Sequence, residues 1–149
     1  MSQILPNRHT IRVYGIHIEH GQVLLCEEGF EDFRFTKFPG GGLEFGEGLS
    51  DALRREFREE LNASFLHAEL FYINDFFQPS AFDAETQVLS VYYLVHGVES
   101  LSMESKTEWR KGKPYEIRFF RKPLEELLLV EDLSFPIDRT VAAKLSALR

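Results

Sequence analysis

Apolar and polar residues alternate along several stretches of the chain, and each such stretch predicts a β-strand. The first, residues 10–19, is rich in β-branched residues and is followed by the turn His20-Gly21. Residues 22–28 are then expected to return beside it as its hairpin partner. Further strands are predicted at 33–38, 65–77, 86–98 and 115–121.

Polar stretches between these strands predict loops. Residues 1–9 are expected to form a loose lead-in, and 29–32 and 78–85 are expected to be connections. Residues 99–113 are charged and show no clear period, so a mobile loop that could carry function is expected there.

The end of the chain predicts helices. Residues 136–148 repeat apolar side chains at i, i+4, i+8 and i+11, which indicates a closing amphipathic helix. A short helix is expected over 124–129, with Pro123 in its first turn.

Another helix is predicted in the middle of the chain, where Leu53, Phe57 and Leu61 recur at every fourth position. These three side chains are expected to form its buried face. Ala52 falls among acidic residues and is expected to leave that side open, while Arg55 falls in the sector expected to face solvent.

Glu56, Glu59 and Glu60 lie within about 100° of one another on this helix. Arg55 and Glu59 form a favourable i, i+4 pair, but the close spacing of the glutamates opposes the helix by a similar amount. Clustered carboxylates suit Mg²⁺, which completes its shell with waters and substrate phosphates. A metal site is one interpretation, and a solvated surface helix is the other.

A glycine-rich turn and an acidic loop precede this helix. Gly40, Gly41 and Gly42 follow Pro39, so a sharp turn is expected that brings backbone groups close to a ligand. Glu47 lies in the loop between this turn and the helix.

This arrangement resembles the Nudix hydrolases. The family pattern is a glycine, a glutamate after a five-residue gap and, after a seven-residue gap, the run Arg-Glu-U-x-Glu-Glu-x-Gly-U, where U is bulky and aliphatic. The first glycine of this pattern is matched by Gly41, and every charged position is matched, by Glu47, Arg55, Glu56, Glu59 and Glu60. Three positions depart from it: Phe57, Asn62 and Ala63. Because Asn replaces Gly well in a left-handed helix cap, we expect Asn62 to preserve the backbone.

The resemblance implies an α/β fold, a Nudix-type α/β/α sandwich with a mixed β-sheet and the two long helices on opposite sides. The implied reaction is hydrolysis of a diphosphate bond in a nucleoside diphosphate linked to another group, with Mg²⁺ or Mn²⁺ as cofactor. Cations are needed because an acidic site would otherwise repel the polyanionic substrate.

Roles for individual residues follow from the same resemblance. The implied metal ligands are three helix glutamates and one backbone carbonyl: Glu56, Glu59, Glu60 and Gly40. Glu47 would assist the metal shell, and Arg55 would orient a carboxylate through its fork of donors. Glu56 is the first choice for the general base.

Later acids are the second choice for the base: Glu104, Glu108 or Glu116, each of which is otherwise a surface residue. Phe76 and Phe82 are candidates for a nucleobase pocket, and Glu116 is a further candidate for substrate binding. The alternative for both aromatic residues is simple packing against the sheet.

Several functional alternatives stay open. The sequence does not distinguish ADP-ribose, a nucleotide sugar, a dinucleoside polyphosphate or a nucleoside triphosphate as substrate. A non-catalytic Nudix-fold module for nucleotide binding or regulation is the main alternative, although such modules usually lose acids that this chain keeps. An isomerase of isoprenoid diphosphates would need a reactive cysteine, and the one cysteine, Cys26, lies in an apolar run.

Composition limits the partners. The chain has 149 residues, of which 44% are hydrophobic, and we expect one domain over 1–149. A net charge of −7 disfavours nucleic acid polymers and anionic membranes as partners. No signal peptide or membrane-length apolar run is seen, so a cytoplasmic location is expected. A homodimer is left open.

Overall fold

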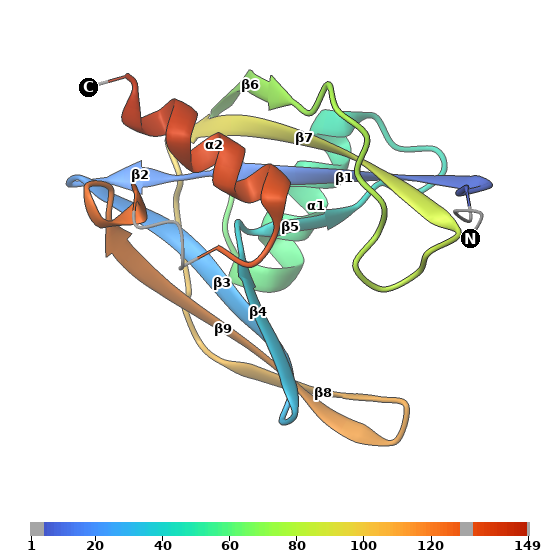
Figure 1. Ribbon diagram of the computed structural model, residues 1–149. Helices are drawn as coiled ribbons and strands as arrows, with labels where there is room; N and C mark the ends of the chain where they lie inside the picture. Colours follow the sequence, from blue (N-terminus) through green and yellow to red (C-terminus); the bar gives the residue numbers. More distant parts are fainter. Residues whose placement is uncertain (1–4, 129–132, 149) are drawn as a thin grey trace.

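The computed structural model describes residues 5–128 and 133–148. Its strands in chain order are β1 (Arg8–Ile16), β2 (Ile18–Glu19), β3 (Gln22–Phe30), β4 (Phe33–Lys37), β5 (Gly40–Gly42), β6 (His67–Ile73), β7 (Thr86–His96), β8 (Lys106–Arg110) and β9 (Lys113–Pro123). The helices are α1 (Leu49–Leu61), the 3-10 turn η1 (Glu126–Leu128) and α2 (Pro136–Ser146). Figure 1 shows their arrangement.

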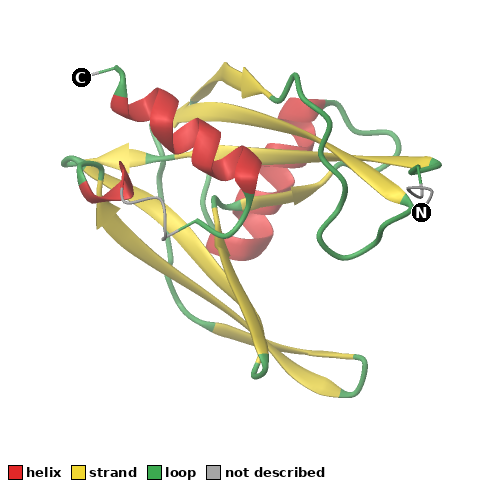
Figure 2. Ribbon diagram, viewed as in Figure 1, coloured by secondary structure: helices red, strands yellow, loops and turns green. Residues whose placement is uncertain are grey.

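The strands form two hydrogen-bonded sheets rather than one. The first is mixed and has the order β5-β1-β7-β6, in which β1 runs parallel to β7 and antiparallel to β5. The second has the order β2-β3-β9-β8. Strand β4 also pairs with β3, on the edge away from β9, and all pairings of this sheet are antiparallel. Figure 2 shows α1 and α2 on opposite sides of the mixed sheet. The predicted α/β/α sandwich is therefore confirmed.

Alternate residues of the strands enter two separate cores. Val13 of β1 and Leu24 of β3 pack with α1, whereas the next residues, Tyr14 and Leu25, pack with α2. This follows from the two-residue period of a strand, which points neighbouring side chains to opposite faces. Strands buried on both faces thus hold the two helices apart and place the loop before α1 at the edge of β1.

Helix α1 has the predicted phase. Leu53, Phe57 and Leu61 are buried against the sheet, and Asn62 caps the helix in the left-handed region with φ 51°. Ala52 was expected to leave an acidic side open, but it is fully buried in the core. The apolar face is therefore wider than the three-residue stripe predicted, as is usual for a helix packed on a sheet.

Several local predictions were wrong. The three glycines form β5, paired with β1, instead of a turn. The expected long strand over 10–19 stops at Ile16, and only β2 forms the hairpin with β3. The expected mobile loop over 99–113 contains β8, whose side chains are almost all exposed and therefore show no apolar period.

The segment after β9 also differs from its prediction. Pro123 ends β9 instead of opening a helix, and the described residues that follow, up to Leu128, contain the 3-10 turn η1. Leu129, the expected end of the short helix, lies outside the described residues. The closing helix is confirmed as α2, with Pro136 in its first turn.

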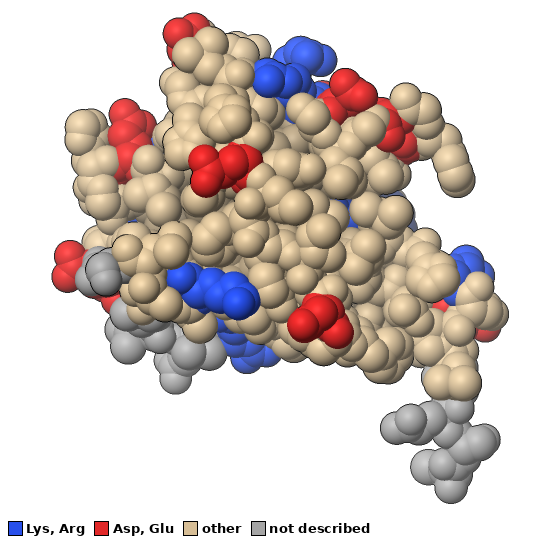
Figure 3. Space-filling model, turned by 90° about the horizontal axis from the view of Figure 1, so that it is seen from above, with Lys and Arg blue, Asp and Glu red and all other residues tan. Residues whose placement is uncertain are grey.

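The outer surface carries both signs of charge. On the face shown in Figure 3, acidic and basic side chains are scattered among uncharged ones. None of the helices that the structure describes is long and apolar enough to cross a membrane.

The packing of α1 gives a first prediction. Phe57→Ala removes a fully buried ring that meets Phe65 edge-on at 5.6 Å. We expect this substitution to lower the free energy of unfolding by about 3–5 kcal/mol, through lost burial and the cavity left behind. Urea unfolding measures this change, with Arg58→Ala on the exposed side of α1 as the matched control. Equal stability of the two variants would contradict the assigned phase of α1.

Candidate functional site

Arg55 lies at the centre of the predicted site. Its guanidinium donates to both oxygens of Glu47, at 2.6 and 3.0 Å, and to Glu56 Oε1 at 2.9 Å. It also donates to the Gly42 carbonyl at 2.9 Å and to Glu59 at 3.3 Å. Only 18% of its side chain is exposed, so the expectation that Arg55 faces solvent was wrong. One planar fork thus joins β5, the acidic loop and α1.

These contacts shift the titration of both partners. The hydrogen bond to Glu47 is the largest influence raising the pKa of Arg55, and burial opposes it. The bond from Arg55 lowers the pKa of Glu47 in turn. Arg55 therefore stays cationic and Glu47 anionic, which fixes the loop before α1.

Two glycines let β5 fit closely between β1 and the Glu56 carboxylate of α1. Gly40 has φ +147°, and a Cβ there would lie 2.1 Å from the Val13 carbonyl oxygen. A Cβ on Gly41 would lie 2.5 Å from Glu56 Oε1. Any larger residue would push the Glu56 carboxylate away from the strand.

The three helix glutamates have different surroundings. Glu56 is 11% exposed and is held by Arg55, whereas 59% of the Glu59 side chain is exposed. Glu60 is half-buried, and its Oε2 has no hydrogen-bond partner among the described residues. Burial raises the pKa of Glu60, and nearby Lys37 opposes that shift. A buried carboxylate oxygen without a partner is costly unless something binds it.

The residues fit a hydrated metal ion better than an enclosed one. Within the described ranges, no three His, Cys, Asp or Glu side chains are arranged to enclose an ion. Mg²⁺ commonly takes only one or two carboxylates and obtains its other ligands from water and phosphate. The unpartnered oxygen of Glu60, beside the exposed Glu59, suits such a site.

Two charged residues at this site were missed from the sequence. Lys37 is 3% exposed, and its ammonium donates to the carbonyls of Gly40 and Phe38 at 3.2 and 3.3 Å. Glu28 Oε2 lies 3.7 Å from that ammonium, and Glu28 Oε1 accepts a bond of 2.9 Å from the Tyr115 hydroxyl. Burial lowers the pKa of Lys37, but its neighbours, Cys26 and Glu28 first, more than compensate and raise it.

A signal for Lys37 was present in the sequence. It lies two residues after Phe35, so both side chains are on the same face of β4. A lysine that continues an aromatic, inward face has to be buried. The position of Glu28 at the site was harder to predict, because the strand over 22–28 was expected to end at this residue.

A model of the NUDIX domain matches residues 6–144 of this chain. The chain belongs to the NUDIX domain family.

Relatives agree with this assignment. An 8-oxo-dGTP diphosphatase of Haemophilus influenzae is 37% identical over 84 residues, which are 54% of this chain and 57% of that protein. The match thus spans little more than half the length of that relative.

Solved structures share the fold. The ORF135 protein of Escherichia coli has a TM-score of 0.71 at 19% identity, covering 95% of this chain and 91% of that one. MutT of Bacillus halodurans has a TM-score of 0.66 at 19% identity, covering 90% of this chain and 80% of that one.

A cavity of about 980 Å³ in this Nudix domain is lined by Glu28 and Lys37, the neighbours of Glu60, and not by the α1 glutamates themselves. The Lys37 ammonium, at this cavity, donates to the Gly40 carbonyl. Phe82 also lines the cavity and meets Phe35 at 5.5 Å between ring centroids. Asp138, at the start of α2, also lines the cavity and accepts a hydrogen bond from the buried Tyr92 hydroxyl.

The other candidate residues lie elsewhere. Phe76 and Glu116 are not among the residues lining the cavity, and Glu116 instead pairs with Arg34 at 2.8 Å. Glu108 pairs with Arg110 on the β8–β9 hairpin, and Glu104 is exposed in the segment before β8. Sequence reasoning could not place Glu104 and Glu108 because it had taken residues 99–113 as an unpaired loop.

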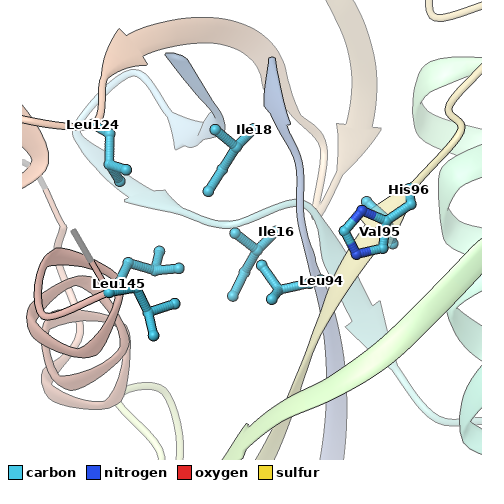
Figure 4. Close-up of a pocket in the computed structure, with 8 residues that line it drawn as sticks. Ile16, Ile18, Leu94, Val95, His96, Leu124 and Leu145 are labelled. Atoms are coloured by element: carbon cyan, nitrogen blue, oxygen red, sulfur yellow. The ribbon is translucent and has the colours of Figure 1, made fainter. Parts of the chain in front are cut away.

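A second cavity, of about 240 Å³, lies at the C-terminal end of α2. Figure 4 shows Ile16, Leu94 and Leu145 pointing into it from three different elements. Of its lining residues, only His96 is titratable. It therefore lacks the groups that a phosphate substrate needs.

The buried Asp138 gives a pH-dependent prediction. Burial raises its pKa from 3.8 to about 6, so the folded state holds this proton more tightly than the unfolded state does. This proton's contribution to the free energy of unfolding is fully present below pH 4. It is lost as the pH rises to 6, which lowers the free energy of unfolding by about 3 kcal/mol. Asp138→Asn keeps an oxygen acceptor for Tyr92 but does not titrate.

Urea unfolding at pH 4 and pH 7 measures this effect. We expect Asp138→Asn to gain stability relative to wild type as the pH rises, whereas Asp32→Asn in the exposed β3–β4 turn should not. An unchanged difference between Asp138→Asn and wild type at the two pH values would contradict the prediction.

Proposed function

We propose that this Nudix domain hydrolyses the diphosphate linkage of a nucleotide-type substrate with the help of Mg²⁺ or Mn²⁺. The observation that carries this proposal is the unpartnered, buried oxygen of Glu60 on the carboxylate face organised by Arg55. That face lies next to a cavity large enough for a nucleoside. Phosphate chemistry and substrate binding can therefore take place side by side.

Glu59 and Glu60 are proposed to hold the metal, with Glu56 and the Gly40 carbonyl completing the protein ligands. When bound, the ion offsets phosphate charge and acidifies a water. Glu56 is proposed as the general base, because Arg55 holds its carboxylate against Gly41, where it can receive a proton from a water. Glu47 keeps Arg55 in place through a two-bond ion pair.

The cavity is proposed to bind the nucleoside. Phe82 offers an exposed aromatic ring for stacking against a base. Asp138 and Tyr92 offer polar groups that can form hydrogen bonds with the edge of a base. Among related proteins, one acts as an 8-oxo-dGTP diphosphatase and another is described as an ADP compounds hydrolase. Both fit the proposed class of substrate, a nucleotide with a diphosphate linkage.

The alternatives make different demands on the site. An isomerase mechanism needs a reactive cysteine, but Cys26 is buried and its burial raises the pKa of the thiol to about 12. A non-catalytic binding module would not need the acids that surround Arg55.

A panel of substrates tests the proposal. The protein is incubated with ADP-ribose, a nucleotide sugar, a dinucleoside polyphosphate, a nucleoside triphosphate and 8-oxo-dGTP, each with Mg²⁺ or Mn²⁺. Product chromatography is expected to reveal a phosphate-containing product from at least one of them, and excess EDTA should abolish it. Binding without turnover for the whole panel would favour the non-catalytic module, and full turnover in EDTA would exclude a metal role.

Glu60→Gln gives a sharper prediction. The substitution keeps the shape of the side chain but removes a buried charge, so turnover should fall by orders of magnitude while stability in EDTA is unchanged or higher. Initial rates and thermal melting measure these effects. Glu99→Gln, at an exposed position outside α1, is the matched control and should retain wild-type rates.

A further inference from the structure

Lys37 is a buried cation at the point where β4 leads to β5. Its ammonium is 3.2 Å from the Gly40 carbonyl and 3.3 Å from the Phe38 carbonyl. Only 4% of its side chain is exposed, so water contributes little to its solvation. A buried ammonium is tolerated only where carbonyls and carboxylates replace that water.

One carboxylate, that of Glu28, lies against this ammonium. Glu28 lies 3.7 Å away and is itself fixed by the Tyr115 hydroxyl. Glu60 is influenced electrostatically by Lys37, Glu28 and Glu56 together. One cation therefore offsets the repulsion between several acids that lie on different elements.

The same groups are those that a divalent ion would use. The Gly40 carbonyl is a proposed metal ligand and already accepts a hydrogen bond from Lys37. An ion near Gly40 and Glu60 would also be repelled by the ammonium. The ammonium cannot move away from the ion without leaving its pocket.

We propose that Lys37 is a resident cation of this site, which holds the Gly40 carbonyl and Glu28 in place and weakens the binding of the divalent ion. The inference rests on the proposed function, because it assumes that an ion binds near Glu60. Lys37 is a positioning residue in this view, since it acts through the metal ligands. It makes the carboxylate face stable before the ion arrives, at the expense of affinity for that ion.

Calorimetric titration with Mn²⁺, without substrate, tests the inference. Lys37→Met removes the charge and retains much of the apolar stem, and we expect it to bind Mn²⁺ about tenfold more tightly than wild type or better. Its melting temperature should fall in EDTA, and Mn²⁺ should raise it by more than in wild type. Lys37→Arg keeps the charge and should remain close to the wild-type affinity.

Two further variants make the result decisive. Lys37→Gln is neutral but can still donate to the Gly40 carbonyl, so it should also bind Mn²⁺ more tightly, even if Lys37→Met does not fold. Lys113→Met removes an exposed charge from the start of β9 and should leave Mn²⁺ affinity unchanged. This control separates a local effect from the change in net charge.

Equal or weaker Mn²⁺ binding by the neutral variants, with the same loss of melting temperature with and without Mn²⁺, would overturn the inference. Lys37 would then be only a support for the turn between β4 and β5. Failure of the wild-type protein to bind Mn²⁺ at all would instead overturn the proposed function, and with it the inference.

Discussion

The ion pair between Arg55 and Glu47 is the interaction on which the proposed site depends. It reaches from α1 to the loop before it, and the same guanidinium also contacts Glu56 and the Gly42 carbonyl. A lysine could not replace it, because an ammonium lacks the planar fork that serves several acceptors at once. The short strand β5, the acidic loop and α1 therefore keep one geometry although few apolar contacts join them.

Much of this arrangement could be predicted from sequence, since its signals are local. The spacing of Leu53, Phe57 and Leu61 gave the buried face of α1, and the left-handed cap was predicted because Asn62 stands where the family pattern has a glycine. The two-sided placement of the long helices followed from the order of elements and the family resemblance. The buried face and the cap of α1 each depend on residues within a few turns of one another, where periodicity and capping rules apply.

Features that depend on distant partners were not predictable. Three consecutive glycines have no preference for a strand, and β5 exists because β1 supplies its hydrogen bonds. Strand β8 has almost no buried side chain, so its pairing with β9 leaves no apolar period. The burial of Lys37 beside Glu28 joins two strands, and although its position two residues after Phe35 indicated burial, nothing in the local sequence indicated Glu28 as its partner.

Strand β1 has a role that goes beyond either core. It is paired on both edges, with β5 and β7, and it sends Val13 and Tyr14 into different cores. A slip of one residue along β7 would exchange these two side chains and displace β5 by about 3.3 Å. The glycine backbone facing Glu56 would then be out of place. Because the two cores accept only one register of β1 on β7, they also fix the position of β5 at the proposed site. A chain that has folded with the wrong strand pairing therefore cannot form an intact site.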